Sequence, residues 1–161
     1  MNKNVNLLAI SYVFGFTAAT ITVFLGAIIG SQITSIKSLS TLPVAFSVVG
    51  TAICTILAAK IMSKIGRRLG FIFAALGSSA AALVATFAIY QQNFILFCIS
   101  NLILGMGMAF THQYRFAAAE SVEKEKAPKA ISVLMLAGIV SSFLGITLAN
   151  YSKDLIPEHL Y

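Results

Sequence analysis

The chain has 161 residues, of which 58% are hydrophobic and only 10% are charged, and its formal net charge is +6. A soluble domain of this length would need far more polar residues to cover its surface, so the composition excludes an ordinary soluble protein. The positive charge does not indicate a nucleic-acid partner, because the basic residues gather in short turns between apolar runs, where contact with anionic lipid and membrane topology account for them.

Five apolar runs follow one another along the chain, each near the ~20 residues that a helix needs to cross the hydrocarbon core. They predict an all-α polytopic membrane protein, with one transmembrane domain over residues 1–161 and no soluble domain. The expected spans are residues 7–30, 42–62, 69–90, 94–118 and 130–150, and residues 151–161 are expected to form a polar tail.

The first span carries two threonines three residues apart, Thr17 and Thr20, which can share one helix face. Two interpretations are open: the side chains face a solute pathway, or each hydroxyl bonds to a carbonyl of its own helix. Gly26 and Gly30 form a small-residue pair that lets a neighbouring helix approach closely. The run is too long for the core of a secretory signal, so we expect it to stay in the mature chain.

A short cationic turn, residues 59–68, separates the second and third spans and contains four of the chain's eleven Lys and Arg residues. Its sequence, Ala-Lys-Ile-Met-Ser-Lys-Ile-Gly-Arg-Arg, resembles the loop signature between helices 2 and 3 of the major facilitator superfamily, Gly-x-x-x-Asp-Arg-x-Gly-Arg-Lys/Arg. Of the six defined positions of this signature, the final Gly-Arg-Arg matches and Lys64 keeps the positive charge of the family's first Arg. Ala59 and Ser63 depart from the pattern, which has Gly and Asp there. The signature positions here are Ala59, Ser63, Lys64, Gly66, Arg67 and Arg68.

In the family, the Asp of this loop helps to hold the cytoplasmic side closed, assisted by the neighbouring Arg residues, so the resemblance implies a cytoplasmic gate motif. Ser63 carries no charge, and any contact that it makes in place of the Asp should be weaker than a charge-assisted one. The alternative is an ordinary positive-inside turn with a helix-stopping glycine.

The fourth span carries polar and small residues at spacings of 4, 3, 4 and 3, which place them along one stripe of a helix. Such a stripe should face protein or water, because lipid offers it no partners. The stripe residues, our candidates for facing a solute pathway together with the two threonines of the first span, are Asn101, Gly105, Met108, His112 and Arg115.

Parts of the fourth span also resemble the same superfamily. Gly105 and Gly107 fit the helix-4 pattern Arg-x-x-x-Gly-x-Gly, with Asn101 in the place of the Arg. Residues 113–120 resemble a segment of a bacterial branch of the superfamily. Counting ~20 residues from Phe94 puts Arg115 at the cytoplasmic interface, where it can snorkel; a gating or solute-contact role is the alternative.

His112 lies one turn deeper than Arg115, as either a neutral packing residue or part of the pathway. The two cysteines, Cys54 and Cys98, lie inside apolar runs and read as small core residues. The sequence contains no paired carboxylates, phosphate-binding loop or metal-ligand cluster. We therefore expect no enzyme activity, no cofactor and no metal.

The basic residues divide unequally between the two sides of the membrane. Only Lys37 and Lys153 fall on one side, so the positive-inside tendency predicts a cytoplasmic N-terminus and a C-terminus outside. The residues on the cytoplasmic side are Lys3, Lys60, Lys64, Arg67, Arg68, Arg115, Lys124, Lys126 and Lys129.

The resemblance implies a fold of twelve helices in two halves that rock about a midplane site. Five spans would make this chain an N-terminal part of such a secondary transporter, in a bacterial inner membrane, acting on a small solute that the sequence does not identify. Its expected partners are the lipid bilayer, the C-terminal half or another membrane chain. The alternative is a small membrane protein that binds a partner and transports nothing.

Overall fold

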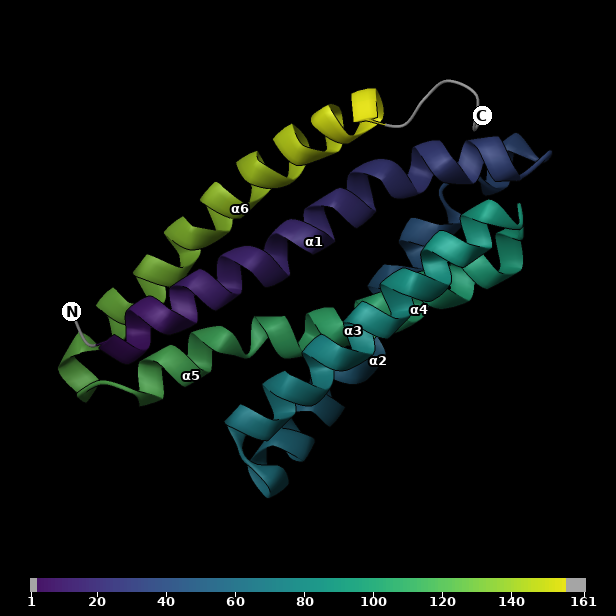
Figure 1. Ribbon diagram of the computed structural model, residues 1–161. Coiled ribbons are helices and arrows are strands. Elements are labelled where there is room, and N and C mark those ends of the chain that lie inside the picture. Colours follow the sequence, from purple (N-terminus) through teal and green to yellow (C-terminus); the bar gives the residue numbers. More distant parts are fainter. Residues whose placement is uncertain (1–2, 156–161) are drawn as a thin grey trace.

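The computed structural model describes residues 3–155, with side chains through Tyr151, and its regular elements are all helical (Figure 1). Five segments in this range are long and apolar enough to cross a membrane, which confirms the expected all-α polytopic fold. The elements are α1 (Lys3–Ile33), the 3-10 turn η1 (Lys37–Leu39), α2 (Leu42–Ile65), α3 (Arg67–Tyr90), α4 (Phe94–His112), α5 (Tyr114–Glu120), the 3-10 turn η2 (Lys124–Lys126) and α6 (Ala127–Leu155).

Local sequence signals set several helix ends. Gly66 has a φ of +85°, a conformation that favours glycine, and it separates α2 from α3. The Asn93 side chain accepts a hydrogen bond of 3.0 Å from the backbone N–H of Leu96 and caps the start of α4. Pro43 and Pro128 each lie in the first turn of a helix, where a missing N–H costs nothing.

Several details differ from the expected spans. Helix α1 covers Lys3–Ile33, where 7–30 was expected, and α2 continues to Ile65. The fourth span is divided at Gln113, where α4 ends and α5 begins, although the N–H of Ala117 still bonds to the Gln113 carbonyl at 3.0 Å. Helix α6 continues to Leu155, so the first part of the expected tail is helical, because no Gly or Pro follows Gly145 in that stretch. Residues 156–161 of the tail lie outside the described range.

The helices pack in two groups, which meet through α5 and through contacts of α1 with α2 and α4 (Figure 1). Helix α1 lies along α6, while α2 and α3 both lie against α4. One core cluster, which includes Tyr12 and Leu134, joins α1, α5 and α6. A second joins α2 to α4 around Cys54 and Ala109, and a third joins α3 to α4 around Phe97.

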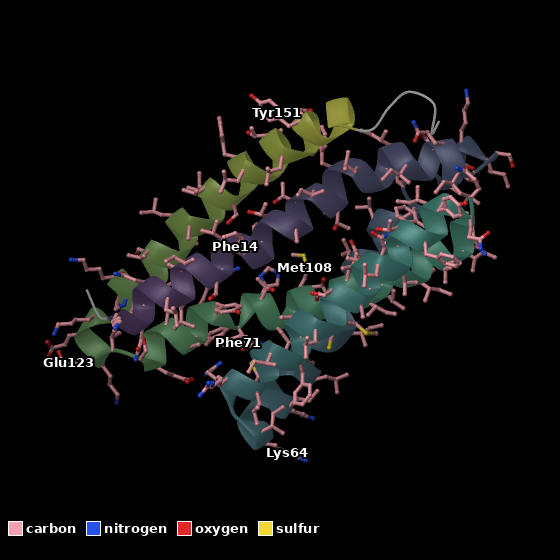
Figure 2. The ribbon with its side chains drawn as sticks, in the orientation of Figure 1. Phe14, Lys64, Phe71, Met108, Glu123 and Tyr151 are labelled. Atoms are coloured by element: carbon pink, nitrogen blue, oxygen red, sulfur yellow. The ribbon has the colours of Figure 1, made fainter. Side chains whose placement is uncertain are left out.

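The start of α1, the α2–α3 turn and the α5–α6 connection lie toward one end of the molecule (Figure 1). In Figure 2, Lys64 and Glu123 lie toward this end and Tyr151 toward the other. The two cationic segments of the described chain therefore share one side of the bundle. We call this side the cationic end.

Candidate functional site

An ion pair joins the cationic turn to the end of the fourth span. Arg67, in the first turn of α3, donates from Nε to Oε2 of Glu120 at 2.7 Å, and its Nη2 donates to Oε1 of the same carboxylate. This two-pronged geometry is the strong form of an arginine–carboxylate contact. Because the Glu120 side chain is 64% exposed, water and salt screen the pair, and its role is to position the turn more than to stabilise the fold.

The other signature positions face outward. The Ser63 hydroxyl donates to the Lys60 carbonyl at 2.8 Å, so it uses its hydrogen within its own helix. Lys64 and Arg68 are exposed, as is Ala59. The turn thus presents cations to its surroundings from three positions, Lys60, Lys64 and Arg68, and fixes a fourth charge, Arg67, on Glu120.

Helices α2 and α4 approach each other at glycines. A Cβ added at Gly105 would lie 1.9 Å from the Ser47 carbonyl oxygen, and one added at Gly50 would lie 2.1 Å from the Leu102 carbonyl oxygen. The Thr51 hydroxyl lies 2.9 Å from the Gly105 carbonyl and links the same two helices. Gly105 of the helix-4 pattern therefore serves backbone-to-backbone packing in this chain.

Asn101, at the start of the predicted stripe, is fully buried. Its Nδ2 donates to the Phe97 carbonyl at 2.8 Å, while its Oδ1 has no hydrogen-bond partner among the described residues. An unpaired buried amide oxygen costs about 1–3 kcal/mol. The stripe thus faces protein at this point, one of the two outcomes expected for it.

A groove of about 490 Å³ lies between α1, α3 and α4. Figure 2 shows Phe14 from α1, Phe71 from α3 and Met108 from α4 around this region. Much of its wall consists of small or hydroxyl-bearing residues, among them Gly15, Ala18, Ala74, Ser78, Gly105 and Gly107. Two stripe residues, Gly105 and Met108, therefore line the groove.

A chain of aromatic rings begins in the wall of the groove, where Phe71 and Tyr114 are lining residues. Phe71 and Tyr114 stack with centroids 3.9 Å apart and planes 10° apart, which ties α3 to α5. Tyr12 of α1 meets Tyr114 edge-on at 6.3 Å and stacks on Phe16 at 5.3 Å. Phe16 in turn meets the His112 ring edge-on at 6.1 Å. These contacts hold the α4–α5 junction against α1 and α3.

The last two stripe residues contact each other. The Arg115 Nη2 lies 3.2 Å from Nδ1 of His112, and because arginine has only donors, this nitrogen must be the acceptor. Arg115 is half-buried, and its Nε is buried without a hydrogen-bond partner among the described residues. The structure thus brings His112 and Arg115 together and leaves one guanidinium donor unused.

Thr17 and Thr20 lie in the contact between α1 and α6. The Thr17 hydroxyl donates to the Val13 carbonyl at 2.7 Å and that of Thr20 to the Phe16 carbonyl at 3.1 Å, which confirms the expected back-bonding within the helix. Thr17 also lies 3.4 Å from the Ser141 carbonyl, and a Cβ on Gly145 would lie 2.8 Å from the Thr20 Cβ. The structure places neither threonine with His112 and Arg115.

Sequence reasoning assigned no role to Glu120. It lies 53 positions from Arg67, so only the tertiary packing of α5 beside the cationic turn brings the two together. The available signal was its position as a lone carboxylate at the end of a span, on the side where the basic residues gather.

The sequence model of the family described as "Major Facilitator Superfamily" matches residues 7–152. The chain is 31% identical over 159 residues to a protein named riboflavin transporter RfnT of Brucella anthropi, a match that covers 99% of the chain and 40% of that protein. It is 28% identical over 152 residues to the MFS-type transporter YdeG of Bacillus subtilis and 24% identical over 148 residues to YddS of the same organism. The chain spans 34–40% of the length of these relatives, and no solved structure matches it.

Proposed function

Because the chain belongs to the major facilitator superfamily, we propose that it forms the N-terminal part of a secondary transporter that moves a small solute by alternating access. The observation that carries this proposal is the family match over residues 7–152, which extends across the five apolar segments. Members of this family are transporters and not enzymes, and the chain is an integral membrane protein with five candidate spans.

The groove supports a proposal for the partner. Its small residues let a helix approach closely in a membrane, where packing and not the hydrophobic effect drives association. The relatives are longer than this chain, so a transmembrane helix from the remainder of such a transporter is the occupant that we propose. The second candidate function is that of a membrane protein that binds a separate chain in the same groove and transports no solute.

The Arg67–Glu120 pair supports the proposed gate role of the cationic turn. It anchors the first turn of α3 to α5 and leaves Lys64 and Arg68 exposed for contacts with the opposing half or with lipid phosphate. Ser63 adds no charge to these contacts. The gate we propose here therefore acts through cations, without a carboxylate in the turn.

Riboflavin is the first solute to test, because the relative whose alignment covers 99% of the chain is named a riboflavin transporter. For the pathway we propose the half-buried residues of the stripe, Met108, His112 and Arg115, with the buried Asn101 and Gly105 fixing helix α4 behind them. Thr17 and Thr20 lie in the contact between α1 and α6, so we propose that they face the pathway in a state of the transport cycle in which this contact opens.

We propose a bacterial cytoplasmic membrane as the location, with the cationic end in the cytoplasm. A labelling experiment tests this orientation in a background without Cys54 and Cys98. In whole cells, a membrane-impermeant maleimide should react with Lys37→Cys and leave Lys64→Cys unlabelled, while permeabilised cells should label both. The physical reason is the unequal distribution of basic residues between the two sides. Labelling of position 64 alone in intact cells would reverse the orientation.

Uptake into liposomes tests the transport function. The 161-residue chain alone should show no saturable riboflavin uptake, because its helices supply only one part of the cavity wall. Joined to the C-terminal remainder of the Brucella anthropi relative, it should give saturable uptake, and the remainder without this chain should give none. Saturable flux through the chain alone, lost in Arg115→Ala, would contradict the proposal and indicate an oligomeric carrier.

A further inference from the structure

Arg115 is a permanent cation in a membrane-spanning segment, yet neither of the two ion pairs found among residues 3–151 includes it. Those pairs join Arg67 to Glu120 and Lys126 to Glu123. Both carboxylates are therefore engaged by other cations. Glu125, the remaining acidic residue of this range, lies exposed in the α5–α6 connection. The described chain thus supplies a half-buried guanidinium without a counter-charge.

The surroundings of Arg115 leave a specific donor free. Nη2 is directed to Nδ1 of His112 at 3.2 Å, while Nε is buried and unpaired. If Nδ1 accepts, the proton of a neutral imidazole lies on Nε2, so His112 can donate from its other side. A buried N–H without an acceptor is unfavourable, and the penalty is larger for a charged group than for a neutral one.

We infer that Arg115, supported by His112, binds an oxyanion, the carboxylate or phosphate group of a small molecule. Arginine presents adjacent N–H groups in a planar fork that matches the two oxygens of such a group. The Phe16 ring packs edge-on against His112, and hydrogen bonds are electrostatically stronger beside apolar groups than in water. Both a soluble anion and a phospholipid head group carry this chemistry. That the anion is a transported solute rests on the proposed function, whereas the binding site does not.

The chain offers a simple spectroscopic test, because it contains three arginines and two histidines. With 15N-labelled arginine in maltoside micelles, which carry no phosphate, each guanidinium Nε–H gives one signal. The signal that disappears in Arg115→Lys is that of Arg115. We expect it to shift saturably when inorganic phosphate or succinate is added, while the signal of the exposed Arg68 shifts only weakly and without saturation.

A parallel titration with phosphatidylglycerol in the same micelles distinguishes the two sources. A saturable response of Arg115 to phosphate or succinate assigns the site to a soluble anion, and a response to the lipid alone assigns it to a head group. No saturable response of the Arg115 signal to any of the three, or a response to phosphate and succinate no larger than that of Arg68, would overturn the inference. Because the titration measures binding, an absence of riboflavin uptake leaves its outcome unaffected.

A matched pair of variants adds a second readout through the ring signals of His112. In Arg115→Lys the charge remains but the fork is lost, so the anion concentration for half-saturation should rise about tenfold, the scale of one charge-assisted hydrogen bond. Arg68→Lys makes the same chemical change at an exposed position and should leave half-saturation unchanged. Equal effects of the two variants would mean that bulk charge, and not the Arg115 site, attracts the anion.

Discussion

Gly105→Ala should open the contact between α2 and α4, with the rate of Cys54 labelling by a maleimide rising about ten- to a hundredfold in detergent. The added Cβ would lie 1.9 Å from the Ser47 carbonyl oxygen, and this atom belongs to a helix backbone that cannot rotate away. Overpacking of this kind costs about 1–3 kcal/mol, which corresponds to the expected range of rates. Cys54 reports the change because it is buried in the α2–α4 cluster with Ala58 and Ala109.

The matched control is Gly77→Ala in α3, because a Cβ at Gly77 would meet nothing within 4 Å. Alanine has the higher helix propensity, by about 1 kcal/mol, so this variant should label at the wild-type rate or more slowly. Both variants are compared after Cys98→Ser, so that Cys54 is the labelled thiol. If Gly105→Ala labels no faster than Gly77→Ala, the close approach of α2 and α4 is not present in the folded chain.

The sequence was sufficient for the helices and their order. Apolar runs of spanning length predict membrane helices because the bilayer core leaves the backbone few other conformations. Gly66 and Pro43 mark helix boundaries through backbone constraints that operate within a few residues. The back-bonding of Thr17 and Thr20 is local in the same way, and it was one of the two interpretations open from the sequence.

The sequence could not supply the contacts between helices. The helical period placed Asn101, Gly105 and His112 along one stripe, but it could not tell that Gly105 packs on Ser47 of α2 while His112 packs on Phe16 of α1. A stripe that spans several turns passes different neighbours, because helices cross at an angle and do not run in parallel. The break at Gln113 changes the neighbours again between α4 and α5.

Reversing one charge of the Arg67–Glu120 pair should lower riboflavin uptake about tenfold in the transporter assembled from this chain and the remainder of its Brucella anthropi relative. In Glu120→Arg, two guanidinium groups would replace a two-pronged contact, so the α2–α3 turn should move away from α5. The pair is screened by water, so the effect on the free energy of unfolding should stay within about 1 kcal/mol. The larger effect on uptake arises because the turn is part of the proposed cytoplasmic gate.

The exchanged pair, Arg67→Glu with Glu120→Arg, should restore uptake to within about twofold of the starting protein, since attraction between the two positions returns. Arg67→Lys keeps the charge but lacks the fork, and it should fall between the single reversal and the starting protein. Lys124→Glu is the control for net charge, because that side chain is exposed in the α5–α6 connection at the same cationic end and has no place in the proposed gate. If Lys124→Glu lowers uptake as much as Arg67→Glu, or if the exchanged pair fails to recover, then the cationic end acts through its total charge and not through the contact between Arg67 and Glu120.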